Sequence, residues 1–304
     1  MVDIHNDNIP ALGNTIAADI PDIKENLEFH KDAFQQITSG WSNTSVANLY
    51  LNFPGLWYGG NPSNATDTEH DITIATGQFT LYNGSTYQGF NLSSAITKKI
   101  DANWSAGTNQ GGFPSGLTLA ASTMYYVFII GKSDGTVDVG FDTDSSATNL
   151  LADATGYTFY RIVRDNFAVF TDSSSNIRNF GVRSSRIYYN TAIEDVADNT
   201  LTDNTYETGT LTVPPNSIAM VSTRGYSASS TGGLAVKLKD KTTGTIIEAG
   251  HLYNTDTPTQ QRIGVYAEVC ADGSRQIDYA LDVFTGGVDP DELYITTYGY
   301  YLQA

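Results

Sequence analysis

The sequence predicts a mainly β protein in which a short N-terminal helix precedes two antiparallel β-sandwich-like domains. The first observation is composition: 12% of residues are aromatic and 16% charged, with abundant Ser, Thr, Asn, Gly and Tyr, a mixture typical of sheets and turns. The second is the run Met124–Ile130, which is apolar at every position, as in a strand buried on both faces. The third is the stretch after the turn at 131–135, where Val137, Val139 and Phe141 alternate with Asp or Gly. These two strands predict a β-hairpin, and similar patterns recur along the chain.

Residues 1–40 form the predicted N-terminal segment, a tail followed by a helix. Asp19 is placed to cap the helix, Pro21 falls in its first turn, and Gly40 ends it. The heptad spacing predicts a short parallel coiled coil that joins subunits into a homotrimer. The alternative is an amphipathic helix lying on the sheet of its own subunit. The seam consists of Ile16, Ile20, Ile23, Leu27, His30, Phe34 and Ile37.

His30 has two interpretations of its own. In a dry core between chains it is a polar register residue whose protonation loosens the assembly at low pH. Otherwise it is a helix residue at the edge of a contact.

The first β-domain is predicted to span residues 41–189. Its opening part, 41–70, is irregular and aromatic, and residues 53–62 are expected to form a loop or a set of turns. Trp57 and Tyr58 on this loop are candidate glycan contacts, and the alternative is that their rings cover the end of a sheet. Strands are expected around 72–74, 79–81, 87–92, 98–104, 124–130, 137–141, 157–163 and 167–171.

A polar, acidic connector at 190–209 is the predicted boundary, and residues 210–304 form the second domain. Ile263, Val265, Ala267 and Val269 are expected to face a core through one strand, and alternate residues of 277–283 on the way back. The number and spacing of strands suggest an antiparallel sandwich, with a jelly roll as one form of it. Strands are expected near 210–213, 217–223, 234–239, 245–253, 262–270, 276–284 and 292–302.

The totals exclude several classes of function. A net charge of −17 disfavours nucleic-acid binding, which needs clusters of Lys and Arg. The longest apolar run is far shorter than a bilayer span, so we expect no membrane insertion. The start of the chain has neither a basic nor an apolar region of a signal peptide, and we expect synthesis in a cytoplasm. The single cysteine, Cys270, allows no intrachain disulfide.

The sequence offers no catalytic motif, no metal site and no cofactor site. Residues 131–135 match G-x-S-x-G, but a nucleophile elbow needs a helix after the turn and here a strand is expected. A serine triad centred on His251 has no supporting pattern. The acidic turn Asp142–Asp144 begins like a calcium loop, but Ala147 stands where glycine is required. Whether this turn binds an ion is left open.

Three tyrosines of the last strand, Tyr294, Tyr298 and Tyr300, are predicted to share one face. Exposed, they would form an aromatic platform for a glycan or a protein; buried, they belong to the core or to a subunit contact.

Five short runs of the first β-domain combine glycines, aromatic residues and aspartates: Lys99–Trp104, Gly111–Gly112, Tyr126–Phe128, Gly135–Thr143 and Gly156–Arg161. Together they resemble a module of tailed-bacteriophage virion proteins, often described as tail-fibre or minor structural proteins. The run Gly-Thr-Val-Asp-Val-Gly-Phe-Asp-Thr at 135–143 is its most specific part. The chain departs from the pattern at Ile162, where a second basic residue is expected, and the resemblance extends to neither the N-terminal helix nor the second domain.

The resemblance implies a non-enzymatic structural component of a phage virion, assembled in the host cytoplasm. Such a protein is an appendage, a tail fibre, a head fibre or a decoration protein, that docks on other virion proteins through its N-terminus and projects its β-domains outward. The alternative is a host-surface carbohydrate-binding protein that uses Trp57 and Tyr58, and a less favoured one is a polysaccharide-cleaving enzyme. The position in tail or head, the oligomeric state and the host receptor are not determined by the sequence.

Overall fold

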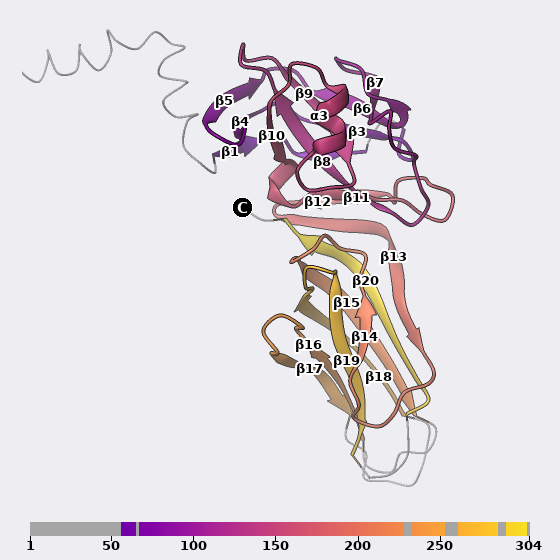
Figure 1. The fold of residues 1–304 in the computed structure, drawn as a ribbon. Helices are drawn as coiled ribbons and strands as arrows, with labels where there is room; N and C mark the ends of the chain where they lie inside the picture. The colour runs from indigo at the N-terminus through magenta and orange to yellow at the C-terminus, as the bar shows by residue number, and fades with distance from the viewer. Residues whose placement is uncertain (1–55, 65–66, 228–232, 253–260, 285–289, 303–304) are drawn as a thin grey trace, which may run out of the picture.

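The computed structural model describes residues 56–64, 67–227, 233–252, 261–284 and 290–302. These residues form two β lobes placed end to end, with β1–β11 in the N-terminal lobe and β13–β20 in the C-terminal lobe (Figure 1). The predicted mainly β class is confirmed. The predicted helix of residues 1–40, with its seven oligomerisation residues Ile16, Ile20, Ile23, Leu27, His30, Phe34 and Ile37, lies outside the described residues.

The larger sheet of the N-terminal lobe is organised around the strand that the sequence marks as buried on both faces. That strand pairs with β9 on one edge and with β10 and β11, one after the other, on the opposite edge. Val127 and Ile129, which share one face of this strand, are completely buried. The sheet contains β1 (Trp57–Gly59), β4 (Gly77–Tyr82), β5 (Tyr87–Leu92), β8 (Met124–Gly131), β9 (Val137–Asp142), β10 (Phe159–Ile162) and β11 (Ala168–Phe170).

The predicted hairpin around the turn at 131–135 is confirmed by the pairing of β8 with β9, and the sheet contains a second hairpin. The Asn83–Gly84 turn joins β4 to β5, and Asn83 accepts backbone hydrogen bonds from Ser85 and Thr86. The predicted loop at 53–62 is only partly correct, because β1 and β2 form at 57–59 and 62–63. These strands were not predicted because they lie among Pro and Gly residues and are too short to show the alternation of a β-strand.

A second, four-stranded sheet completes the N-terminal lobe. Ile72, Ile74 and Ile100 point from it into the core shared with the larger sheet, and all three are completely buried. Its last pair, β6 with β7, is parallel, and β7 lies in a stretch where the sequence predicts no strand. The sheet contains β2 (Pro62–Ser63), β3 (Asp71–Ile74), β6 (Ile96–Asn103) and β7 (Gln110–Phe113).

Two short helical elements, which the sequence did not predict, lie beside the larger sheet. Helix α3 (Thr148–Asp153) buries Leu150 against β8 and β9, and η1 (Val163–Asp165) follows β10. A single helical turn is too short for its apolar period to be recognised in sequence. Within the described ranges, no helix has the length and apolarity needed to cross a bilayer.

The C-terminal lobe consists of two antiparallel sheets that face each other across one core. One sheet has the strand order β12-β13-β20-β15-β18, and the other has the order β14-β19-β16-β17. The predicted alternation is confirmed: Ile277, Leu281 and Val283 are buried. The strands are β12 (Phe180–Arg183), β13 (Arg186–Asp198), β14 (Glu207–Thr210), β15 (Ile218–Ser227), β16 (Leu234–Lys239), β17 (Ile246–Leu252), β18 (Gln261–Cys270), β19 (Gln276–Val283) and β20 (Glu292–Tyr301).

The first part of the predicted connector at 190–209 is a strand. Residues 190–198 belong to β13, which pairs with β20 on both sides of an irregularity between Tyr188 and Ile193. Ile193 and Val196 point into the core while Glu194 is exposed, so the polar composition reflects a strand with one solvent face. The division at 189 and 210 into two domains stays a prediction.

The two lobes are joined by a buried group of aromatic side chains, which we call the interlobe seam. Phe167 contacts Phe180 with ring centroids 5.3 Å apart. The Tyr189 ring centroid lies 6.3 Å from that of Phe170 and 6.4 Å from that of Tyr300. Edge-on and tilted packing of this kind is the favourable geometry for aromatic pairs. The seam consists of Phe167 and Phe170 from the N-terminal lobe and Phe180, Tyr189 and Tyr300 from the C-terminal lobe.

Hydrogen bonds across the seam are equally well buried. The Tyr300 hydroxyl donates to Ala168 O at 3.0 Å and accepts from Ala168 N at 3.3 Å. The Asn166 amide donates to Tyr301 O at 2.9 Å. The Tyr300 side chain of β20 therefore bonds to the edge of β11 that has no neighbouring strand at Ala168. The two lobes form one continuous body.

Candidate functional site

A buried ion pair occupies the centre of the residues that carry the phage resemblance. The Lys98 ammonium lies 3.0 Å from Asp138 Oδ1, and both side chains are almost fully buried. The ammonium also donates to Ser105 O, and the other carboxylate oxygen of Asp138 accepts from Gly107 N at 2.8 Å. Burial lowers the pKa of Lys98, which the negative charge of Asp138 opposes.

Two aromatic residues of the same motif enclose this pair. The Trp104 ring lies 5.1 Å from the Lys98 ammonium, and its indole N–H donates to Val139 O. The Tyr157 ring packs edge-on against Trp104 with centroids 5.5 Å apart. Burial, with a contribution from the charge of Asp138, raises the pKa of Tyr157 to about 12. Lys98, Asp138 and Tyr157 are buried and Trp104 is half-buried, and the cluster holds β6, β9 and the segment before β10 together.

The acidic turn after β9 is also committed to internal contacts. Asp142 is completely buried, and its carboxylate accepts from Leu150 N at 2.8 Å and from the Asn149 amide at 2.9 Å. Asp144 accepts from Ser146 N and from the Ser146 hydroxyl. These carboxylates hold the turn before α3, and across the described residues no cluster of His, Cys, Asp and Glu suits a metal ion.

The other candidates for chemistry are dispersed. The turn of residues 131–135 is a hairpin closed by Lys132 N donating to Thr136 O, and β9 follows it, as predicted. His251 is exposed on β17, and its Nδ1 lies 3.4 Å from Glu248. The motif residues that the structure brings together thus build a framework around α3 and the Lys98–Asp138 pair.

The predicted glycan contacts, Trp57 and Tyr58, lie side by side on β1 but on opposite faces. Trp57 packs on Phe79 with centroids 4.5 Å apart, and its indole N–H donates to Gly59 O. The guanidinium of Arg161 covers Trp57 at 5.5 Å. Tyr58 alone is available, with 73% of its surface exposed. Trp57 therefore matches the alternative, a ring that covers the end of a sheet.

The three tyrosines of the last strand do not share one face. Tyr294 and Tyr298 are half-exposed on the outer face, whereas Tyr300 is completely buried in the interlobe seam. The reason is a β-bulge: Met220 of β15 pairs with Gly299 and the next residue, Val221, with Thr297, which leaves Tyr298 as an extra residue. The prediction was wrong for Tyr300 because a bulge reverses the alternation beyond it.

The outer face of the five-stranded sheet carries a group of aromatic and cationic residues that we call the tyrosine–arginine face. Its members lie on the three adjacent strands β18, β15 and β20, and the cross-strand register places Arg262 opposite Tyr226 and Arg224 opposite Tyr294. The face consists of Arg224, Tyr226, Arg262, Tyr266, Tyr294 and Tyr298.

Each arginine of this face is stacked on a tyrosine. The guanidinium of Arg224 lies 4.3 Å from the Tyr294 ring centroid, and that of Arg262 lies 5.3 Å from the Tyr226 ring. Stacking of this kind fixes the guanidinium plane and leaves its N–H groups free to donate. Among the described residues, neither guanidinium has a hydrogen-bond acceptor or carboxylate partner at contact distance.

Two depressions lie on this face, one at each end. The first has a volume of about 320 Å³ and is lined by Arg224, Tyr226, Arg262 and Glu292. The second, of about 390 Å³, is mainly apolar, and its lining includes Tyr266 and Met220. Between them the small residue Gly264 pairs with Arg224, and Ser222 pairs with Tyr266 on one side and with Thr296 on the other.

The Tyr266–Tyr298 pair forms one wall of the apolar depression. Their rings lie 5.4 Å apart, and the Tyr266 hydroxyl donates to the Tyr298 hydroxyl at 3.5 Å. This contact raises the pKa of Tyr266 and lowers that of Tyr298. Tyr266 is highly exposed, with 76% of its surface accessible.

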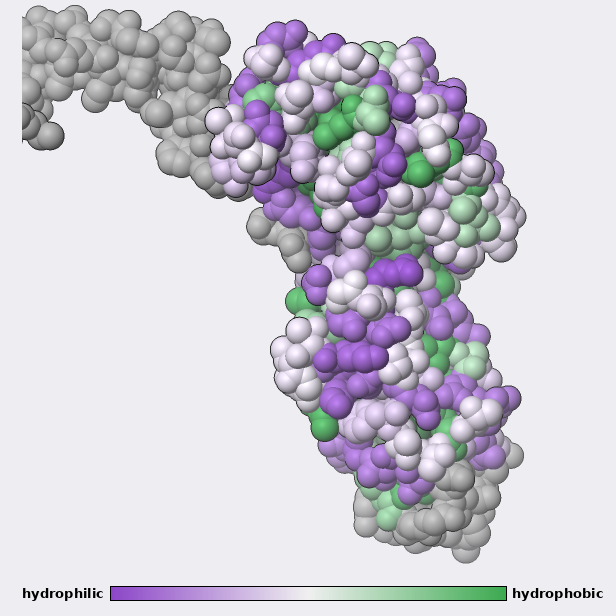
Figure 2. All heavy atoms as spheres, in the orientation of Figure 1, coloured by the Kyte–Doolittle hydropathy of each residue, from purple (hydrophilic) through white to green (hydrophobic). Residues whose placement is uncertain are grey.

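The opposite sheet of the C-terminal lobe has a different character. Lys237 lies 2.6 Å from Asp282, and Lys239 and Lys241 each lie 3.8 Å from Asp278. These pairs neutralise one another on a solvated face, which is the usual state of surface charges. Figure 2 shows a hydrophilic band across the viewed side of this lobe. The free arginines are thus a property of one sheet only.

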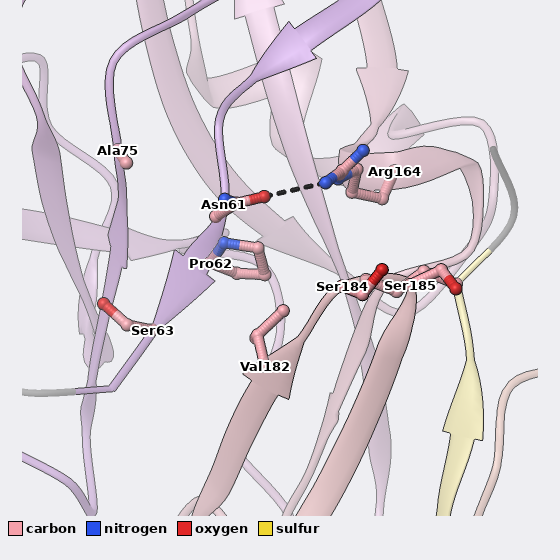
Figure 3. A pocket seen from close by; sticks show the side chains of 9 residues that line it. Asn61, Pro62, Ser63, Ala75, Arg164, Val182, Ser184 and Ser185 are labelled. Atoms are coloured by element: carbon pink, nitrogen blue, oxygen red, sulfur yellow. Dashed lines mark hydrogen bonds between the residues drawn. The ribbon is translucent and has the colours of Figure 1, made fainter.

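A further depression, of about 520 Å³, lies between the lobes (Figure 3). Its upper wall carries Asn61 and Arg164, joined by a 2.8 Å hydrogen bond from the Arg164 guanidinium, and its lower wall carries Ser184 and Ser185. Arg164 has a left-handed backbone (φ 52°). The Nε atom of Arg164 is buried without a hydrogen-bond partner, so this nitrogen is not exposed to the depression. The depression therefore offers fewer free hydrogen-bond donors than the tyrosine–arginine face.

Sequence reasoning missed the arginines and Tyr266 of this face. The signal was present, because the expected inward positions Ile263 and Val265 imply that Arg262, Gly264 and Tyr266 face outward. What the sequence did not give is the order of strands, which places β18 beside β15 and β15 beside β20.

Comparison with known proteins gives little. No family model and no curated protein matches the chain. The structure of infectious bursal disease virus Gx strain matches with a TM-score of 0.25, 12% identity, and coverage of 86% of this chain and 80% of that chain. Infectious bursal virus derived T=1 particles give a TM-score of 0.24 and 11% identity, covering 84% of this chain and 72% of that chain. Dimeric latent PorU from Porphyromonas gingivalis gives 0.23 and 10%, covering 80% of this chain and 21% of that chain. TM-scores this low carry no conclusion about fold or function.

Proposed function

We propose that this chain is a non-enzymatic structural component of a phage virion, an appendage such as a tail fibre, head fibre or decoration protein. In this role residues 1–40 dock on other virion proteins and join three copies, and the two β lobes project outward. The observation that carries the proposal is the interlobe seam, which turns two lobes into one elongated body.

A projecting structural part must resist bending at the junction of its lobes. The seam rings are nearly fully buried, and the Tyr300 hydroxyl is held by both backbone groups of Ala168. A hinge between domains usually has a small, polar interface, and this junction has an apolar one. Its burial supports a rigid rod-like element.

The strand order of the C-terminal lobe supports the same role by analogy. Eight strands alternate between two sheets of order β13-β20-β15-β18 and β14-β19-β16-β17, which we infer to be a jelly roll of two Greek keys. Jelly rolls are common in viral capsid and lectin domains. Because one fold serves many functions, the analogy supports a class of protein and assigns no activity.

The phage resemblance is compatible with this framework role. Its residues supply Asp138, the partner of Lys98, together with the aromatic contacts of Trp104 and Tyr157 and the turn at Asp142. All of these contacts are internal. A module whose characteristic residues stabilise the fold is expected in a structural protein.

The proposal is tested by locating the chain in particles. An antiserum against the purified chain, followed by a gold-labelled second antibody, is applied to purified virions from the source strain and viewed by negative-stain electron microscopy. Gold at a fixed place on head or tail supports the proposal. Particles without label, when the chain is detected only in the particle-free lysate, contradict it.

The anchoring role of residues 1–40 is tested separately by light scattering. Ile23→Asp with Leu27→Asp in the full chain should reduce the oligomer to a monomer, because charges in a heptad seam are unpaired in the core. The exposed control Lys99→Ala should keep the full-length mass. An unchanged oligomer in the double variant would remove the coiled coil from the proposal.

A further inference from the structure

We propose that the tyrosine–arginine face binds a glycan bearing carboxylate groups, such as a chain of uronic acids or a sialylated oligosaccharide. This inference goes beyond the structural role proposed above and does not require it, because binding is a property of the isolated chain.

The first argument is that Arg224 and Arg262 are pre-organised donors without acceptors. Each guanidinium is stacked on a tyrosine, at 4.3 and 5.3 Å, and among the described residues none accepts its hydrogen bonds. A planar guanidinium matches a carboxylate through two parallel hydrogen bonds. Because stacking already limits the side-chain rotamers, less conformational entropy is lost when an anion binds.

The second argument is charge complementarity. The chain carries a net charge of −17, yet the depression at Arg224 and Arg262 is lined by two cations and the single acid Glu292. The cations of the opposite sheet, in contrast, are paired with Asp278 and Asp282. A locally cationic depression on an acidic protein favours an anionic ligand.

The third argument concerns shape. From Tyr226 to Met220 the face extends about 20 Å along β15, at the usual rise of a strand. Its ends carry flat rings, and the small residues Gly264, Ser222 and Thr296 lie between these ends, with Gly264 opposite Arg224 and Thr296 opposite Ser222. Sugar rings present C–H groups to the electron-rich face of an aromatic ring, and their hydroxyls bond to Ser, Thr and Tyr. An extended saccharide fits this arrangement.

The residue types of this face also occur at protein interfaces. The centre of such an interface is enriched in Tyr, Met and Arg and depleted in Lys, Asp and Glu. Here Arg224 and Ser222 lie on the central strand β15, and Met220 supplies the apolar side chain of the far depression. A second copy of the chain, or another protein, is therefore the competing outcome that the experiment must detect.

The experiment is titration calorimetry of the full chain with three probes. Tetragalacturonate carries carboxylates, its methyl ester has the same sugar rings without charge, and 3′-sialyllactose presents the other kind of acidic sugar. At least one acid should bind, and tetragalacturonate, where it binds, should bind about tenfold or more tightly than its ester. The two acids distinguish a uronic from a sialic source. Added salt should weaken binding, since exposed ion pairs are screened.

Substitutions locate the site. Arg224→Ala and Arg262→Ala should each weaken binding about tenfold, and Arg224→Lys should retain only part of it because the fork is lost. Tyr266→Ala should weaken the acid and the ester alike. The matched control Lys99→Ala removes one positive charge from the exposed surface of the other lobe and should leave binding unchanged.

Three results would overturn the inference. One is the absence of binding of both acids in the titration. Another is equal affinity for acid and ester, together with full binding by Arg224→Ala. The last is a fall in oligomer mass for Arg224→Ala with Tyr266→Ala in light scattering, which would identify the face as a contact between copies.

Discussion

Tyr300→Phe tests whether the two lobes depend on one hydroxyl. The hydroxyl donates to Ala168 O and accepts from Ala168 N, on the edge of β11 that has no neighbouring strand at this residue, and the side chain is completely buried. Removing it leaves one backbone donor and one acceptor without partners in an apolar seam. Each such group costs about 1–3 kcal/mol, so we expect a loss of about 2–4 kcal/mol in the free energy of unfolding.

The assay is urea unfolding followed by two probes. Of the three tryptophans, Trp57 and Trp104 lie in the N-terminal lobe and Trp41 lies outside the described residues. In a Trp41→Phe background, tryptophan fluorescence therefore reports on the N-terminal lobe, whereas far-UV circular dichroism reports on both lobes. In the wild-type chain the two transitions should coincide. In Tyr300→Phe both midpoints should fall by roughly 1 M. Tyr300→Ala, which also leaves a cavity, should separate the transitions.

The control is Tyr266→Phe, which removes a hydroxyl from an exposed side chain and should change the free energy of unfolding by less than about 0.5 kcal/mol. A Tyr300→Phe chain as stable as this control would refute the reasoning. Two separate transitions in the wild-type chain would show that the lobes unfold independently and that the seam is weak.

Three further predictions concern the N-terminal lobe. Asp138→Asn should lower the free energy of unfolding by about 3–5 kcal/mol, because it leaves the Lys98 ammonium buried without a counter-charge. The double variant Lys98→Met, Asp138→Asn should recover most of this loss, since Asn still accepts from Gly107 N. An equal loss in the single and double variants would contradict the account. Gly140→Ala would place Cβ 2.4 Å from Leu150 Cδ1 and should cost about 1–3 kcal/mol in thermal unfolding, while Gly116→Ala, with open space around it, should be neutral. The pKa of Tyr157 is raised to about 12 from 10, so its contribution is complete below pH 10 and is lost as the pH rises towards 12; Tyr157→Phe should make stability fall less steeply over that range in urea titrations, and equal slopes would show that Tyr157 ionises normally.

Much of the strand pattern was predictable because alternation is a local property. The expected strand at 234–239 coincides with β16, and that at 262–270 with β18 to within one residue. Local signals failed where an element was short or where strand pairing altered its meaning. Helix α3 has one turn, and β13 reads as an acidic connector until its pairing with β20 is known.

The candidate site was less predictable than the fold. Trp57 and Tyr58 stand out in sequence as adjacent aromatics, yet a neighbouring strand and Arg161 cover the first of them. Arg224 and Arg262 are far apart in sequence, and only the register between β15 and β18 brings them to one depression. Pairing between strands that are distant in sequence cannot be predicted from a short stretch of residues.

The bulge at Tyr298 and Gly299 links two properties that look independent. Gly299 has a φ of 151°, and a Cβ there would lie 1.8 Å from Ile187 O, so no other residue fits without moving β13. Regular pairing of β20 without the bulge, with Tyr298 opposite Met220, would exchange Tyr300 with Tyr301 between interior and solvent. The bulge therefore determines both which side chains β20 exposes on its outer face and whether Tyr300 is buried between the lobes. A change in the register of β20 that alters one of these must alter the other.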